Sequence, residues 1–336
     1  CLAKVLNEHA DLLLFESDPQ GEKVLRHEIS GYLYSSRGVK CTPDQVVIAA
    51  GTQQLTNHLA RIMRKMNISH VSTEDPGYMP LQNIFRDMGF TLTKIPVHSD
   101  GINIEKLPVN IPSAVYVSPS NQFPTGAVMP IGRRYRLLDW AMKNHSIILE
   151  DDYDSELRYY GKPVLSLQGM DLQDCVIYMG TPSKVLPPSI RLSYLVLPVV
   201  LYEDFHKHRK AYGQSAGVLE QLAWAMYMDE GEWHKQIRRL RKHYLEKSKY
   251  FTSLLRHYLD DTYEVIDPEG GVYAGIRKAH NKGDVFRLRA LQAGCDIKVI
   301  DRDETGIVEV LLSFSGIPTR DLDRAVQVLA EAWKGL

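Results

Sequence analysis

A lysine that follows a buried strand is the group in this sequence best suited to covalent chemistry. Lys184 comes shortly after an apolar run at 176–180, and Thr181 and Ser183 lie between the two. A desolvated lysine has a lowered pKa, so its neutral amine can attack a carbonyl group. Arg191 could bind a phosphate together with the two hydroxyls. A site for pyridoxal 5′-phosphate (PLP) needs an amine that can form an imine with the cofactor and donors that can bind its phosphate, and this segment offers both. The alternative is a surface lysine after a strand.

Consecutive carboxylates end another apolar run. Asp151 and Asp152 follow residues 146–150, and Tyr153 comes directly after them. Adjacent carboxylates repel each other, and a pyridinium nitrogen would compensate, because it needs one carboxylate to stay protonated. A nearby phenol could hydrogen-bond the ring 3-oxygen. Metal binding is the rival interpretation, but no His or further oxygen cluster accompanies the run at ligand spacing, so we predict no metal site.

A glycine-containing helix start follows the first predicted strand. Gly51, Thr52 and Gln53 open a helical pattern directly after an apolar run. The N–H groups at a helix amino terminus bind anions, and a glycine permits close approach of the ligand. The alternative is a simple helix cap by Thr52.

Two turns after predicted strands carry further candidates. Tyr78 ends the turn EDPGY and could stack on a planar ring, although an isolated tyrosine is more often part of the packing. Asn121 or Gln122, in the turn-rich segment SPSNQFPTG, could reach a ring oxygen or could satisfy the backbone of its own loop. We take Asn121 as the candidate cofactor ligand.

Apolar runs alternate with helical patterns from residue 45 to 197. The predicted strands are Gln45–Ala50, Val71–Thr73, Thr91–Pro96, Ala114–Val117, Ser146–Glu150, Cys175–Gly180 and Leu192–Leu197, with helices near 53–67, 78–89 and 132–144. This alternation predicts an α/β domain with a mostly parallel, seven-stranded sheet. Ligands of such sheets bind beyond the carboxyl ends of the strands, which is where the candidate residues fall.

A smaller α+β domain is predicted at the carboxyl end. Residues 200–258 have an almost entirely helical pattern, and the predicted strands after them are Tyr263–Ile266, Gly271–Ile276, Ile297–Val299 and Val308–Phe314, with a closing helix after Pro318. We therefore expect a large domain at 36–230 and a small domain at 231–336. Residues 1–35 would cover one of these domains or a partner subunit.

Composition excludes several classes of function. The formal net charge of −1 gives no electrostatic footprint for nucleic acid. The cysteines are scattered (Cys1, Cys41, Cys175 and Cys295), which argues for a reducing, cytoplasmic setting without zinc or disulfides. No apolar stretch is long enough to cross a membrane. The sequence starts at Cys1 and not at a methionine, already within a helical or loop pattern. We therefore expect a fragment whose N-terminal part is missing.

Six motifs follow one another between residues 17 and 198: SDPQGEKVLRHEISGYL, AAGTQQL, EDPGY, SPSNQFPTG, EDDYDSELRY and GTPSKVLPPSIRLSYLVLP. In these motifs the chain resembles the fold-type I aminotransferases. More closely, it resembles the aminotransferase-like domain of the MocR/GabR-type bacterial transcriptional regulators.

The resemblance implies PLP as cofactor, with Lys184 forming the Schiff base. It implies that Asp151 pairs with the pyridine nitrogen, with Asp152 as the alternative. Tyr153 would contact the 3-oxygen, and Tyr78 would stack on the ring. The implied phosphate ligands are Gly51, Thr52, Gln53, Thr181, Ser183 and Arg191.

Three positions depart from the related proteins. Leu311 stands where aminotransferases have the arginine that clamps the substrate α-carboxylate, and a leucine cannot form that bidentate pair. Pro80 replaces an arginine of regulators that sense γ-aminobutyrate. Glu16 replaces a tyrosine that often reaches a neighbouring subunit's phosphate. These departures favour PLP binding without ordinary transamination.

We therefore expect the effector-binding and dimerisation domain of a PLP-dependent regulator. Its effector would be an amine or amino-acid-like compound that forms an external aldimine with PLP. The chain would form a homodimer and would reach DNA only through a missing N-terminal winged-helix domain. The alternative is a catalytic fold-type I aminotransferase; a PLP-free structural relative is a third interpretation, disfavoured because the expected contact residues are present.

Overall fold

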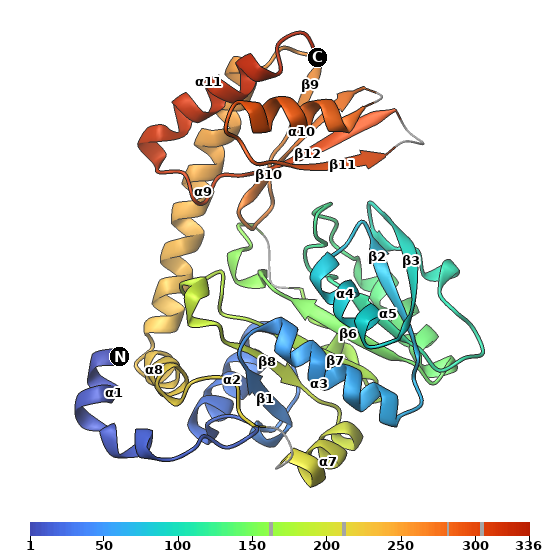
Figure 1. Cartoon of the computed structure of the whole chain (residues 1–336), viewed down its shortest axis with the longest axis vertical. Helices are drawn as coiled ribbons and strands as arrows, with labels where there is room; N and C mark the ends of the chain where they lie inside the picture. The colour runs from blue at the N-terminus through green and yellow to red at the C-terminus, as the bar shows by residue number, and fades with distance from the viewer. Residues whose placement is uncertain (161–163, 210–212, 281, 303–305) are drawn as a thin grey trace. The chain divides into compact units, whose positions relative to one another are not determined.

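The computed structural model describes residues 1–160, 164–209, 213–280, 282–302 and 306–336. The chain divides into two units. Residues 1–155 and 162–236 form unit 1, and residues 156–161 and 237–336 form unit 2. The long helix α9 (Glu232–Tyr258) begins in unit 1 and continues into unit 2 (Figure 1). Residues 210–212, within the stretch expected to be helical, lie outside the described residues.

Unit 1 is built on an eight-stranded sheet of order β1-β8-β7-β6-β5-β2-β3-β4. The strands are β1 (Val46–Ala49), β2 (His70–Asp75), β3 (Thr91–His98), β4 (Gly101–Ile102), β5 (Ala114–Val117), β6 (Ile147–Asp152), β7 (Val176–Gly180) and β8 (Ser193–Val196). The expected α/β class is confirmed. The sheet has one strand more than the seven expected, because β4 has only two residues and leaves no pattern in the sequence.

Strand directions bring many chain segments to one edge of this sheet. The pairs β3–β2, β2–β5, β5–β6 and β6–β7 are parallel, whereas β8 pairs antiparallel with both β7 and β1. The strand β1 therefore runs in the same direction as β7. The carboxyl ends of β1, β2, β5, β6 and β7 and the amino end of β8 all lie at this edge, which we call the ligand edge.

Helices cover both faces of the sheet. Those of unit 1 are α1 (Leu2–Glu8), α2 (Lys23–Arg37), α3 (Thr52–Lys65), α4 (Met79–Asp87), α5 (Ile131–Lys143), α6 (Leu167–Met170), α7 (Val199–His208) and α8 (Val218–Asp229). One core packs α3 and α4 against strand residues that include Tyr116 and Leu149. The other packs α5 against residues that include Val115 and Ile148. Successive strand side chains thus enter different cores, as the two-residue period of a strand requires.

Unit 2 is an antiparallel sheet with helices. Its strand order is β11-β12-β10-β9, from β9 (Tyr263–Ile266), β10 (Tyr273–Ala279), β11 (Lys298–Arg302) and β12 (Ile307–Ser313). Helices α10 (Gly283–Gln292) and α11 (Leu322–Ala332) pack with the sheet around Phe286, Phe314 and Trp333. Figure 1 shows both helices, in orange and red, beside these strands.

The described ranges contain neither a membrane-spanning helix nor a cluster of metal ligands. None of their helices combines the length and the apolar character needed to cross a membrane. Nor do the described residues bring together three His, Cys, Asp or Glu side chains that could hold a metal ion.

Candidate functional site

The candidate cofactor residues lie together at the ligand edge of unit 1. Gly51, Thr52 and Gln53 follow β1, Tyr78 follows β2, Asn121 follows β5, Asp151 and Tyr153 lie at the end of β6, Thr181, Ser183 and Lys184 follow β7, and Arg191 precedes β8. Because β1, β8, β7, β6, β5 and β2 are consecutive neighbours in the sheet, these residues form one row.

An anion cradle lies where β1 and β8 meet this edge. Gly51 caps α3 with a positive φ of 87°, and a Cβ at this position would lie 2.5 Å from Nη2 of Arg191. Only a glycine therefore lets the backbone lie against the guanidinium. The hydroxyl oxygens of Thr52 and Ser193 are 3.4 Å apart. A helix amino terminus, a guanidinium and hydroxyls together suit a phosphate group. The sequence did not indicate Ser193, because it is an ordinary strand residue.

The segment after β7 adds two more hydroxyls. The side-chain oxygens of Thr181 and Ser183 are 2.7 Å apart, and the Thr181 hydroxyl donates to the Leu192 carbonyl at 3.0 Å. The latter bond fixes Thr181 beside the start of β8. Lys184 is half-buried, and its Nζ lies 5.8 Å from the ring centroid of Tyr153. Lys184 follows β7 and Tyr153 follows β6, and the structure thus brings the two side chains close together.

Asp151 is a buried carboxylate on the α3 and α4 side of the sheet. It lies two residues after Leu149, and it accepts a hydrogen bond from the hydroxyl of Tyr116, which belongs to the same core. Burial and, to a smaller extent, the Asp152 charge together raise the pKa of Asp151 to about 6, while the Tyr116 hydrogen bond opposes the shift. A cationic ring nitrogen would relieve this cost. The sequence did not reveal Tyr116, because pairing it with Asp151 requires the strand register.

Asp152 is already neutralised by the protein. Nε and Nη2 of Arg37 donate to its two carboxylate oxygens at 2.6 and 3.3 Å, and the Tyr178 hydroxyl donates to the same carboxylate. Arg37 also donates to the Val164 carbonyl and the Ser120 hydroxyl. The carboxylate and the guanidinium are both nearly fully buried. Asp152 therefore holds the end of α2 on the sheet, and Asp151 is the carboxylate of the doublet suited to a ligand.

Tyr78 interacts electrostatically with both charged parts of the site. It is half-buried and immediately precedes α4. Burial and the Asp151 carboxylate raise the pKa of Tyr78, while the Arg191 guanidinium lowers it. The phenol is thus within electrostatic reach of both groups, as expected for a ring placed over a ligand that spans them.

The loop after β5 separates the roles of Asn121 and Gln122. The Asn121 amide donates to the Asp154 carboxylate at 2.6 Å and is half-buried. Gln122 is 1% exposed, and its amide donates to the main-chain carbonyls of Pro76 and Phe123 and to the carboxylate of Glu74. Gln122 therefore supports the backbone of this loop and of the turn after β2, whereas Asn121 remains at the ligand edge. Glu74 was not indicated by the sequence.

The residues present fit PLP. The cradle of Gly51 and Arg191 would receive the phosphate, the buried and incompletely neutralised carboxylate of Asp151 would receive the ring nitrogen, and Lys184 supplies an amine. This donor set matches an aromatic aldehyde that carries a phosphate.

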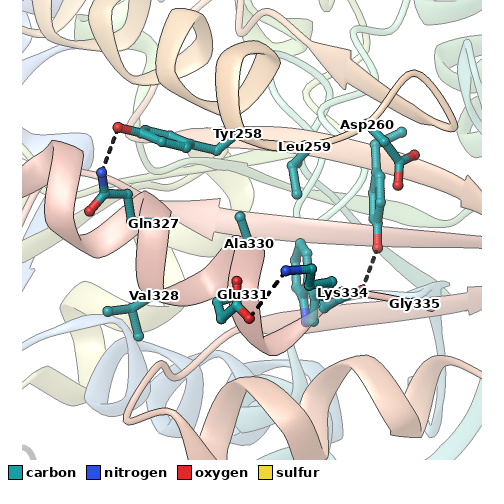
Figure 2. A pocket seen from close by; sticks show the side chains of 11 residues that line it. Tyr258, Leu259, Asp260, Gln327, Val328, Ala330, Glu331, Lys334 and Gly335 are labelled. Carbon is teal, nitrogen blue, oxygen red and sulfur yellow. Dashed lines mark hydrogen bonds and ion pairs between the residues drawn. The ribbon is translucent and has the colours of Figure 1, made fainter.

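A pocket of about 660 Å³ lies elsewhere, in unit 2. Figure 2 shows Gln327 of α11 pointing toward Tyr258 at the end of α9, with a hydrogen bond of 2.7 Å, and Lys334 paired with Glu331 at 3.6 Å. None of the candidate residues lines this pocket, and these polar side chains already pair with one another. We assign no chemistry to it.

The structure also shows the surroundings of Leu311, the position where the aminotransferase pattern has an arginine. Leu311 is half-buried in β12, opposite Gly275 and Lys298. Arginines of unit 2 that could bind a carboxylate instead are already in ion pairs: Arg158 with Glu269, Arg277 with Glu309, and Arg287 with Asp284.

Known proteins resemble this chain over most of its length. The family model "aminotransferase class I and II" matches residues 7–329. The HTH-type transcriptional regulator YdeL of Bacillus subtilis (strain 168) is 38% identical over 319 residues, which are 94% of this chain and 68% of YdeL. The probable rhizopine catabolism regulatory protein MocR of Rhizobium meliloti is 33% identical over 324 residues, 94% of this chain and 65% of MocR.

Among solved structures, the fold is similar to that of LysN, an α-aminoadipate aminotransferase from Thermus thermophilus complexed with N-(5′-phosphopyridoxyl)-L-leucine. The TM-score is 0.84 at 22% identity, over 99% of this chain and 87% of LysN. At this identity the likeness concerns the fold.

Proposed function

The chain belongs to the aminotransferase class I and II family and, within it, to the HTH regulators of MocR type, and from this premise we propose that it senses a small amine through PLP. In this proposal it is the effector-binding and dimerisation domain of a bacterial transcriptional regulator in the cytoplasm. The observation that carries the proposal is the row of cofactor residues at the ligand edge, in a chain whose relatives are named as HTH regulators.

The cofactor of this family is PLP. When bound, it supplies an aldehyde that condenses reversibly with amines and a ring that withdraws electrons. Lys184 would offer the amine, Asp151 would hold a proton at the ring nitrogen, and Tyr78 would cover the ring. Tyr153 and Asn121 would serve the ring 3-oxygen. The remaining residues would bind the phosphate: Gly51, Thr52, Gln53, Thr181, Ser183 and Arg191.

Sensing requires that an amine can compete with Lys184 for the same aldehyde. Lys184 is half-buried, so the protein does not fully enclose this residue. The effector must bind one state of the domain better than another, because only a difference in affinity shifts the populations of two states. A DNA-binding domain attached to the chain would then read the shift.

The homodimer and the link to DNA are part of the same proposal. Residues 1–35, which we assign to the domain or dimer interface, carry exposed apolar side chains, with Leu14 82% and Phe15 71% exposed. Such side chains are typical of surfaces that a partner covers. The chain spans 68% of YdeL and 65% of MocR, which leaves room in those proteins for an HTH segment.

The second candidate is a catalytic aminotransferase, favoured by the fold and by Lys184. Leu311 opposes it, because a substrate α-carboxylate would lack its arginine. The test uses the product of the complete gene. Amines are titrated into the PLP-loaded protein while visible absorbance and DNA affinity are followed. A regulator should change both without turnover, whereas steady transamination without a change in DNA affinity would support the enzyme.

A further inference from the structure

Glu74, at the end of β2, is a buried carboxyl group with incomplete hydrogen bonding. Its side chain is 2% exposed. Oε2 accepts hydrogen bonds from the Ser118 N–H and the Gln122 amide, each at 3.2 Å, whereas Oε1 has no partner among the described residues. An ionised carboxylate in this position would bear the cost of desolvation without full compensation. A protonated acid avoids most of that cost.

The groups that face Glu74 also favour the uncharged acid. Among the described residues, Asp151 from β6 acts on Glu74, and Glu74 in turn raises the pKa of Tyr116 from β5; neither partner is a cation. From α4, Gln82 donates to the Glu74 main-chain carbonyl, at 3.4 Å. Burial first, and then the Asp151 charge, raise the pKa of Glu74 to about 8, although its two hydrogen bonds oppose the shift.

Gln122 connects Glu74 to two segments that carry candidate ligands. Its Nε2 lies 2.9 Å from the Pro76 carbonyl, in the turn that leads to Tyr78, and 2.7 Å from the Phe123 carbonyl. Its Oε1 accepts from the Thr125 hydroxyl at 2.6 Å and from the Thr125 N–H at 3.1 Å. One buried amide thus ties the turn after β2 to the loop after β5.

We propose that Glu74, as an uncharged acid, and Gln122 form a positioning pair that fixes the Tyr78 turn against the Asn121 loop around the cofactor. The pair acts through Tyr78 and Asn121 and does not touch the reacting atoms. The positioning role rests on the proposed PLP site, whereas the charge state of Glu74 can be tested without any cofactor.

The charge state is measured by infrared spectroscopy of the cofactor-free chain at pH 7. The wild-type spectrum should contain a carbonyl band of a protonated acid that is lost in Glu74→Gln and retained in Glu105→Gln, a surface control. Raising the pH above about 8 should remove the same band. If Glu74→Gln instead removes an ionised carboxylate band, the uncharged acid is refuted, whatever the chain binds.

The positioning role is measured by the PLP dissociation constant. Glu74→Ala and Gln122→Ala should each weaken binding by about tenfold or more, and Glu74→Gln should recover most of the affinity that Glu74→Ala loses. Gln45→Ala is the matched control: Gln45 is also a buried glutamine bonded to the main chain, at Leu197, but it precedes β1 at the opposite edge.

Normal PLP affinity in Gln122→Ala, with the fold intact by circular dichroism, would overturn the positioning role. A Glu74→Gln variant as weak as Glu74→Ala would overturn the uncharged form. If the wild-type chain binds no PLP, the proposed function fails, and the infrared result still decides the charge of Glu74.

Discussion

Asp151 and Asp152 are neighbours in β6, yet they serve opposite faces of the sheet. Asp151 accepts from Tyr116 on the side of α3 and α4, whereas Asp152 is held by Arg37 at the end of α2. The strand period therefore places one carboxylate where the proposed cofactor would bind and the other in the scaffold. The doublet can be near a cofactor without both carboxylates acting on it.

This division predicts different effects of two matched substitutions. Asp151→Asn should weaken PLP binding by about tenfold or more while changing stability little. Asp152→Asn should cost about 3–5 kcal/mol of unfolding free energy, because it leaves the buried Arg37 guanidinium without its counter-charge. Urea unfolding of the cofactor-free chain and PLP titration measure the two effects. A larger loss of PLP affinity in Asp152→Asn would reverse the assignment.

Lys184 should be the residue that carries the cofactor. The PLP-loaded chain should be yellow, and borohydride should fix the cofactor to Lys184, as mass spectrometry of peptides can show. Lys184→Ala should lose this attachment, whereas Lys65→Ala, a change at an exposed ion pair with Asp204, should keep it. Attachment to another lysine would remove the basis of the site.

Gly51 should be intolerant of a side chain. A Cβ there would lie 2.5 Å from the Arg191 guanidinium, and the positive φ adds about 1–3 kcal/mol of strain. Gly51→Ala should therefore weaken PLP binding by displacing Arg191. Gly132→Ala in the first turn of α5 is the control, since nothing lies within 4 Å of its Cβ, and it should leave PLP binding unchanged. Equal PLP affinity in both variants would contradict the cradle.

The stability of the cofactor-free chain should fall between pH 7 and pH 8.5. Glu74 has a pKa raised from 4.5 to about 8, so in this range the folded chain holds a proton that the unfolded chain has lost. The stabilising contribution of this proton is complete below pH 4.5 and disappears as the pH rises through 8. The expected loss is about 1 kcal/mol. Urea unfolding should show this slope in the wild type and a flatter profile in Glu74→Gln.

Burial raises the pKa of Glu150 from 4.5 to about 7, so this group adds a smaller loss of the same sign at the lower end of the window. Burial lowers the pKa values of His58 and His70 below 6.5, so their effect has the opposite sign and fades by about pH 7.5. Burial raises the pKa of Cys41 from 9.0 to about 11, and its effect grows above about pH 8.5. A slope in Glu74→Gln as steep as that of the wild type would assign the proton to another residue.

Transamination of common L-amino acids should stay far below about 1 s⁻¹, a rate within the range typical of metabolic enzymes. The reason is Leu311, which removes the guanidinium that orients an α-carboxylate. Leu311→Arg should raise the single-turnover rate with a simple amino acid. Ser313→Arg, two residues further in β12, controls for the added charge. If neither variant reacts faster, Leu311 is not the position that limits catalysis.

Local motifs were enough to predict where the ligand edge lies. Lys184, Gly51 and Asp151 each follow a recognisable apolar run, and a parallel sheet brings such ends together. Long-range pairs could not be predicted. Arg37 meets Asp152 across 115 residues, and the Tyr116–Asp151 contact depends on the register of β5 against β6. A single sequence carries the pattern of each strand but not its alignment with the next.

The strand β8 lies between β7 and β1 in the sheet but follows both in the sequence. It therefore determines when the proposed site can be completed during synthesis. Gly51 leaves the ribosome before its partner Arg191 and the strand β8, which separates β1 from β7 and is made about 140 residues later. A nascent chain that has not yet reached Val196 therefore lacks part of the proposed anion cradle, whatever part of the sheet it has formed. At the proposed site, PLP would therefore bind only after β8 has been synthesised, as a late ligand of the sheet.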